Sequence, residues 1–138
     1  MKRLLFASVA VLSLSLAYAA DPPAPVKPLP PSQLTPLMQM KLDKSKTILE
    51  GLALEDFEKI ASNAQLLRLL SMESGWNVIQ TEEYAAQSQD FRRSADLIIA
   101  AAKDKDIHRA AIGYVALTVR CVECHSYMRK HRNELLKQ

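Results

Sequence analysis

Proline is absent after Pro36, and glycine occurs only three times in the 138-residue chain. Because proline breaks a helix interior and glycine weakens one, their scarcity over most of the chain favours long helices. No segment alternates apolar and polar residues as a half-buried strand does. There is also no basic stripe interleaved with aromatic residues, so no nucleic-acid partner is expected. The sequence therefore predicts one all-α domain.

The N-terminus has the features of a secretory signal peptide. Lys2 and Arg3 precede an apolar run from Leu4 to Leu16, and Ala17-Tyr18-Ala19 supplies a small-x-small cleavage pattern. The run is shorter than the roughly 20 residues of a membrane helix, so an uncleaved anchor is only the alternative. Cleavage of residues 1–19 would leave no integral membrane segment and 16 basic side chains (18 minus two) against 15 acidic ones. The predicted location is periplasmic or secreted.

Composition divides the rest of the chain into a tether and a folded domain. All seven prolines lie between Pro22 and Pro36, which predicts an extended, polyproline-type tether over residues 20–33. Residues 34–138 then form the domain, where apolar residues recur at helical spacing in four segments. The segments are Leu34 to Glu50, Leu54 to Met72, Thr81 to Lys103, and Asp104 or Asp106 to about Lys137. Gly51 is expected to end the first segment, and Thr81 and the two aspartates are good helix caps.

Each predicted helix carries one apolar stripe. The stripes are Met38, Leu42, Ser45, Leu49 and Leu52 in the first; Phe57, Ile60, Ala61, Ala64, Leu67 and Leu70 in the second; Tyr84, Ser88, Phe91, Ala95, Ile98 and Ala102 in the third; and Ile107, Ala111, Tyr114, Thr118, Cys121, His125 and Met128 in the fourth. Four such helices joined by short connections pack most economically as an antiparallel up-down-up-down four-helix bundle.

The chemical signal lies in the last helix. Cys121-Val122-Glu123-Cys124-His125 is C-x-x-C-H, the attachment signature for c-type haem. Residues i, i+3 and i+4 share one face of a helix, so the two thiols can reach the two vinyl groups of haem and form thioethers. His125 follows directly and can bring an imidazole nitrogen to the iron. Export supports this interpretation, because c-type cytochromes mature on the far side of the membrane.

Three other chemistries use the same residue types. A redox dithiol at C-x-x-C belongs in a thioredoxin-like strand-helix setting, and the sequence predicts no strands. A zinc site would need Cys121, Cys124 and a more distant histidine such as His131 or His108, at a spacing that matches no familiar zinc finger. A local disulfide is the ordinary fate of two exported cysteines. The complete C-x-x-C-H pattern on a helix favours haem over all three.

With its signal peptide, four helices and single C-x-x-C-H near the C-terminus, the chain resembles the class II c-type cytochromes, the family of the cytochromes c-prime and their low-spin relatives. The match extends to C-x-x-C-H-x-x-x-R, because Arg129 stands four residues after His125. The resemblance covers about residues 34–132 and implies one covalent haem c per chain. It also implies that Arg129 lies near the haem, where it orients a propionate or shields the ring edge. Where relatives often have an aromatic residue before that arginine, this chain has Met128.

The sixth coordination position of the iron decides between two functions. A thioether ligand saturates the iron and suits electron transfer, whereas an apolar residue there leaves the iron open to small gases. Met38 is on the inward stripe near the start of the first helix, which an antiparallel bundle brings close to His125. By resemblance, low-spin relatives take their methionine from this region. Met40 and an open site are the alternatives, since a methionine on an apolar stripe is often only core filling.

The sequence therefore predicts a periplasmic monohaem electron carrier that is not an enzyme and has redox proteins as partners. Its predicted haem-binding residues are Cys121, Cys124 and Arg129, and its predicted iron ligands are His125 and Met38. The alternative is a cytochrome c-prime-like five-coordinate protein that binds nitric oxide or carbon monoxide. Many relatives dimerise, so a homodimer is one of the assembly states that the resemblance implies.

Overall fold

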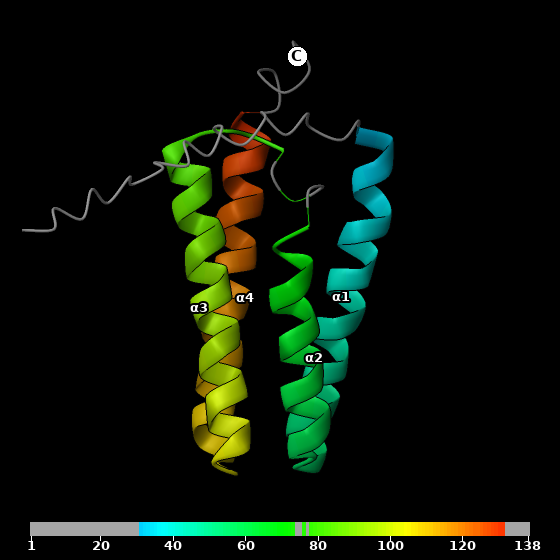
Figure 1. Cartoon of the computed structure of the whole chain (residues 1–138), viewed down its shortest axis with the longest axis vertical. Coiled ribbons are helices and arrows are strands. Elements are labelled where there is room, and N and C mark those ends of the chain that lie inside the picture. The colour runs from blue at the N-terminus through cyan, green and yellow to red at the C-terminus, as the bar shows by residue number, and fades with distance from the viewer. Residues whose placement is uncertain (1–30, 74–75, 77, 132–138) are drawn as a thin grey trace, which may run out of the picture.

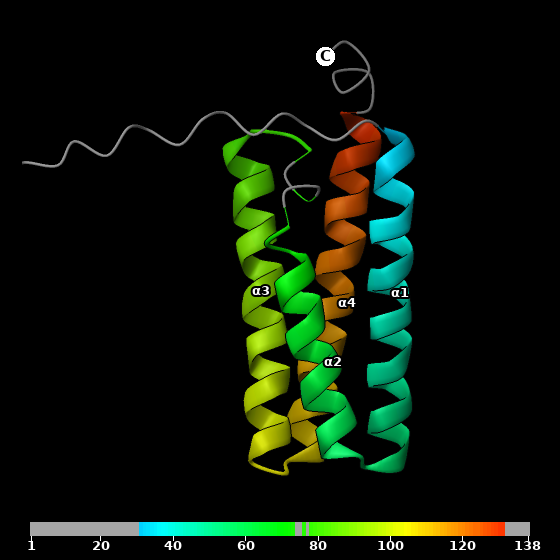
Figure 2. The same ribbon diagram turned by 45° about the vertical axis from the view of Figure 1, so that its right-hand side comes forward.

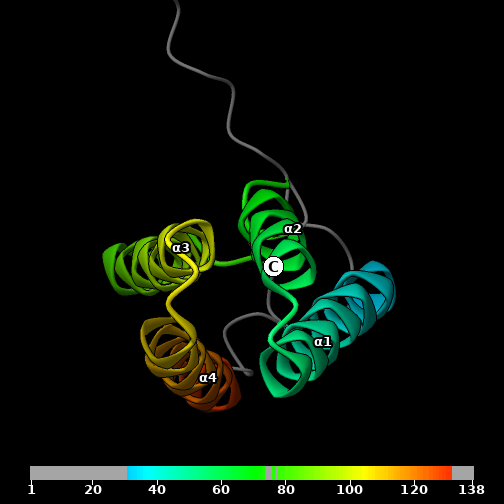
Figure 3. The same cartoon turned by 90° about the horizontal axis from the view of Figure 1, so that it is seen from below.

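The computed structural model describes residues 31–73, 76 and 78–131. It confirms the all-α prediction: α1 (Pro31–Leu54), α2 (Phe57–Leu70), α3 (Glu82–Lys103) and α4 (Ile107–Lys130) form a four-helix bundle. The helices run alternately down and up (Figure 1), and they surround one axis in chain order (Figure 3). The signal peptide and residues 20–30 of the tether lie outside the described residues, and α1 begins three residues before the expected domain boundary.

The ends of the helices follow local hydrogen bonding. Asp56, Thr81 and Asp106 cap the N-termini of α2, α3 and α4, and each side chain accepts a hydrogen bond from the backbone N–H three residues on. Of the two aspartates considered for α4, Asp106 is the N-cap, whereas Asp104 ends α3. No described helix is both long and apolar enough to span a bilayer.

The prediction that Gly51 ends the first helix was wrong, because α1 continues to Leu54. Gly51 instead allows α1 and α2 to pack closely: a Cβ placed there would lie 2.9 Å from Cγ1 of Ile60. Gly113 has the same role between α4 and α3, where an added Cβ would lie 2.9 Å from Cγ1 of Ile98. Both glycines are therefore sites of close helix contact.

The core confirms the predicted stripe of α3, all six members of which are buried. On α1 the predicted stripe was partly wrong. Leu42 and Leu49 are 49% and 54% exposed, whereas the neighbouring Ile48 is fully buried and Leu37 is 7% exposed. A shift of one residue turns a helix by about 100°, so α1 presents a different face to the core than expected.

The connection between α2 and α3 also enters the core. Trp76 is 2% exposed, and its indole N–H donates a hydrogen bond of 2.7 Å to Oγ of Ser88. The hydroxyl of Tyr84 donates to the backbone carbonyl oxygen of Trp76. These bonds fix Trp76 against α3, where its ring lies beside the ring of Phe91 at 5.1 Å between centroids.

Candidate functional site

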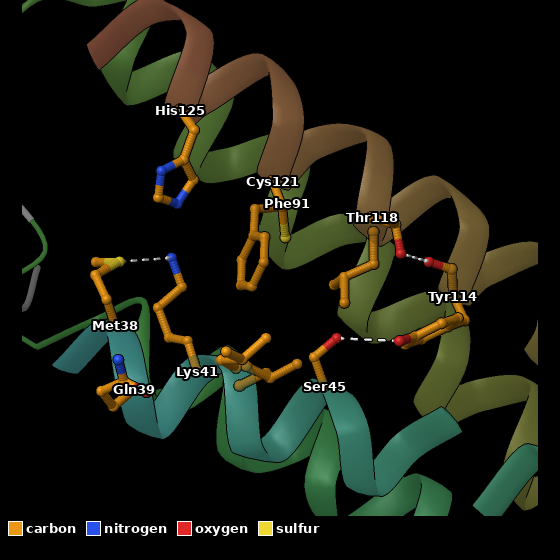
Figure 4. Close-up of a pocket in the computed structure, with 12 residues that line it drawn as sticks. Met38, Gln39, Lys41, Ser45, Phe91, Tyr114, Thr118, Cys121 and His125 are labelled. Atoms are coloured by element: carbon orange, nitrogen blue, oxygen red, sulfur yellow. Dashed lines mark hydrogen bonds between the residues drawn. The ribbon is translucent and has the colours of Figure 1, made fainter. Parts of the chain in front are cut away.

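A cavity of about 480 Å³ lies between α1 and α4. This volume falls within the range of sites that hold small molecules and cofactors. Its walls come from all four helices and are mostly apolar. The lining residues are Met38, Gln39, Lys41, Leu42 and Ser45 of α1, Leu67 of α2, Phe91 of α3, and Tyr114, Leu117, Thr118, Cys121 and His125 of α4 (Figure 4).

The cavity brings together three of the five site residues predicted from sequence. Cys121 and His125 border it from α4, and Met38 borders it from α1. The start of α1 lies beside the end of α4 (Figure 2), so Met38 and His125 face each other across one end of the cavity (Figure 4). The expected antiparallel juxtaposition of these two residues is therefore present in the fold.

The other two predicted residues lie outside the cavity lining. Cys124 is half-buried and packs against the hydrophobic core. Arg129 is exposed in the last turn of α4, four residues after His125. Its positive charge still acts on the site, because it helps to lower the pKa of the His125 imidazole.

The remaining methionines of the described chain are placed differently from Met38. Met40 and Met72 are 46% and 60% exposed. Met128 is half-buried and packs against the core. Among the described methionines, Met38 is thus the one whose thioether borders the cavity.

The two cysteines are free thiols. Burial raises the pKa of Cys121 and of Cys124 above the usual value, and the charge of Lys41 only partly opposes this. Both are therefore protonated at neutral pH, unlike the thiolate of a catalytic redox dithiol. In the described ranges no three His, Cys, Asp or Glu side chains are grouped so as to hold a metal ion by themselves.

The His125 imidazole favours its neutral form. Partial burial lowers its pKa, and the positive charges of Lys41 and Arg129 lower it further. A neutral imidazole has a free nitrogen lone pair, which is the form that binds a metal. The other two histidines lie away from the cavity: His108 is exposed, and His131 stacks on Tyr127 with ring centroids 4.0 Å apart.

Sequence reasoning missed Lys41, whose amine enters the cavity. Its Nζ lies 3.6 Å from the ring centroid of Trp76 and donates a hydrogen bond of 3.7 Å to Sδ of Met38. Within the described part of the chain, no carboxylate forms an ion pair with it. Burial lowers the pKa of Lys41 to about 8, although Cys121 and Cys124 act in the opposite direction. The i, i+3 spacing from Met38 could have indicated this placement, but lysine is ordinarily a surface residue.

The opposite end of the cavity has a polar contact between the same two helices. The hydroxyls of Ser45 and Tyr114 lie 3.2 Å apart and share a hydrogen bond. Thr118, one turn along α4, donates to the backbone carbonyl oxygen of Tyr114 at 2.9 Å. The cavity therefore has a polar end near Ser45 and an end with potential metal ligands near His125 (Figure 4).

Comparison with known proteins gave no relative for this arrangement. No protein-family model, curated protein or solved structure matches the chain.

Proposed function

We propose that this protein is an exported monohaem c-type cytochrome that transfers electrons. One observation carries the proposal: a C-x-x-C-H segment borders a cavity of cofactor size, and a methionine borders the same cavity from the facing helix. Neither the motif nor the cavity would be persuasive alone. Together they support the proposal, because Cys121 and His125, two of the three residues that would attach haem c, border a space of cofactor size, and Cys124 follows Cys121 by one turn of the same helix.

The residues that line the cavity, together with Cys124 outside the lining, would meet the chemical needs of haem c. Cys121 and Cys124 would hold the group through thioether bonds, and the neutral imidazole of His125 would bind its iron. Sδ of Met38 would supply the sixth ligand. Bound haem would supply an iron centre that gains and loses one electron. The apolar side chains of the lining, including Leu67, Phe91 and Leu117, would exclude water from the bound group and so help to set its reduction potential.

The resemblance to class II c-type cytochromes supports the proposal, because the motif stands in the last helix of a four-helix bundle. Within this proposal, Arg129 acts as a nearby positive charge. Its exposed position in the last turn of α4 would allow it to reach a propionate or to shield the ring edge. Export to the periplasm and redox proteins as partners belong to the same proposal.

The gas-binding function is retained as a second candidate because of one contact. Nζ of Lys41 donates a hydrogen bond to Sδ of Met38. A thioether engaged in this way has one of its lone pairs occupied, which would disfavour its binding to iron. If Met38 stayed in that arrangement, reduced iron would have an open position for nitric oxide or carbon monoxide.

The first experiment is to produce the full chain in a host that matures c-type haem and to stain a denaturing gel for haem. Thioether-linked haem survives denaturation, so we expect the wild type to stain. The C121A/C124A double variant provides the control and should lose the stain. An unstained wild-type band would overturn the proposal.

Visible spectra of the reduced protein, with and without carbon monoxide, then distinguish the two functions. For an electron carrier we expect sharp low-spin bands that the gas leaves unchanged. M38L should bind carbon monoxide after reduction, whereas M40L, which alters an exposed methionine two residues away, should behave as the wild type. A wild-type spectrum that shifts with carbon monoxide would favour the gas binder instead.

A further inference from the structure

Lys41 and Met38 present two donor atoms to one end of the cavity. They lie three residues apart on α1, so their side chains share a face of the helix. Nζ of Lys41 is 3.7 Å from Sδ of Met38, and both point toward the side of the cavity that holds His125 (Figure 4). The amine is thus as well placed as the thioether to face that imidazole.

The environment of Lys41 differs from that of a surface lysine. Lys46, on the same helix, has a side chain that is 67% exposed and pairs with Asp43 across 3.8 Å. Lys41 is half-buried, and its neighbours are the rings of Trp76 and Phe91, at 3.6 and 5.2 Å, and a thioether. Nothing in the described residues gives it an anionic partner. Its amine has therefore been brought into the site without a counter-charge.

We propose that the Lys41 amine is a second iron ligand of this site, which takes the sixth position of ferric haem when the Met38 thioether does not. The inference rests on the proposed function, because it requires bound haem. In the exchange, the bond from Sδ to iron breaks and a bond from Nζ to iron forms. The proton of the ammonium passes to water, and the oxidation state of the iron does not change.

The two donors suit different oxidation states. An amine nitrogen is a harder donor than a thioether sulfur, so the amine favours ferric iron and the thioether favours ferrous iron. One turn of α1 would then offer ferric iron a substitute ligand where the Met38 thioether is absent, whereas ferric protein with Met38 in place would keep the thioether. In the reduced protein the amine is a weak competitor, which is why M38L is expected to bind carbon monoxide after reduction.

The test compares ferric proteins carrying covalent haem at one neutral pH, by visible and electron paramagnetic resonance spectroscopy. We expect ferric M38L to stay low-spin, to lose the weak red band of methionine ligation, and to show a signature of two nitrogen ligands. M38L/K41R keeps the positive charge but not a side chain that can ligate, and should become high-spin. K41R alone should keep the methionine band, as should K46R, which alters an exposed lysine.

Two results would overturn the inference alone: ferric M38L that is already high-spin, or M38L/K41R that stays low-spin. In both cases the haem remains attached, so the proposed function stands. If wild-type protein carries no covalent haem on a denaturing gel, the proposed function and this inference both fail. If Lys41 only packs against Trp76, M38L and M38L/K41R will have the same spin state.

Discussion

Replacing Lys41 with methionine tests whether the amine in the cavity lowers the free energy of unfolding. Methionine keeps a straight side chain of similar length but removes the charge. Burial lowers the pKa of Lys41 from 10.5 to about 8, so at neutral pH the folded chain holds a charged amine where its surroundings favour a neutral one. We therefore expect the K41M chain, produced without haem and with reduced cysteines, to be more stable than the wild type at pH 7.

The expected size follows from the pKa difference. One pKa unit corresponds to about 1.4 kcal/mol, so the difference of about 2.5 units between 10.5 and 8 amounts to roughly 3 kcal/mol against the folded state. The cation–π contact with Trp76, which the variant also loses, offsets about 1 kcal/mol. The net gain in unfolding free energy should be about 2 kcal/mol.

The sign of the pH dependence is fixed by which state binds more protons. Between pH 8 and 10.5 the amine is protonated in the unfolded chain and neutral in the folded chain. Wild-type stability therefore gains about 1.4 kcal/mol per pH unit from Lys41 in this window. The raised pKa values of Cys121 and Cys124 contribute with the opposite sign, because their thiols ionise first in the unfolded chain. The wild type and K41M share the effect of the two cysteines, so it largely cancels in the difference between their unfolding free energies.

Urea denaturation followed by circular dichroism, from pH 7 to 10.5, measures this difference. The advantage of K41M should shrink steadily above pH 8. K46M is the control, and because Lys46 is exposed its effect should stay within about 0.5 kcal/mol. A K41M chain no more stable than the wild type at pH 7, or an advantage that does not change with pH, would refute the reasoning.

Two further substitutions test the packing of α4 against α3 and its N-cap. G113A should destabilise the bundle by about 1 to 2 kcal/mol, because crowding of the new methyl group against Ile98 exceeds the roughly 1 kcal/mol gained in helix propensity. A thermal melt with an unchanged midpoint would contradict this. Y127F removes the hydrogen bond of 2.8 Å between Tyr127 and Thr81, which ties α4 to the cap of α3. It should cost about 1 kcal/mol in urea, and no cost would mean that water replaces the bond.

Features that depend on local chemistry could be predicted from the sequence. Thr81 caps α3 because its hydroxyl accepts from the N–H of Tyr84, and that pairing needs only the neighbouring residues. The stripe of α3 repeats at strict 4-3-4-3-4 spacing, and this regular period is enough to predict its buried face. Apolar residues at helical spacing also predict a helix around the C-x-x-C-H segment, and α4 contains this segment.

Features that depend on how neighbouring helices pack could not be predicted from the sequence. α1 has apolar residues on several faces, including the exposed Met40 and Leu54, so its sequence does not single out the buried face at Ile48. Whether a glycine ends a helix or lies at a crossing, as Gly51 does, depends on where α2 lies. The burial of Lys41 depends on Trp76, which approaches from a different part of the chain.

The cavity between α4 and α1 explains why the stripe predicted on α4 differs from its buried face. The buried residues of α4 are Ala110, Gly113, Leu117 and Tyr127, and none of them belongs to the predicted stripe. The predicted members Tyr114, Thr118, Cys121 and His125 border the cavity. Tyr114 and Cys121 also pack against the core, whereas Thr118 and His125 are exposed. α4 therefore has two faces to cover, one packed against α3 and one turned toward α1. A helix that only packs against protein needs the first face alone, whereas the cofactor that we propose would require the second face as well.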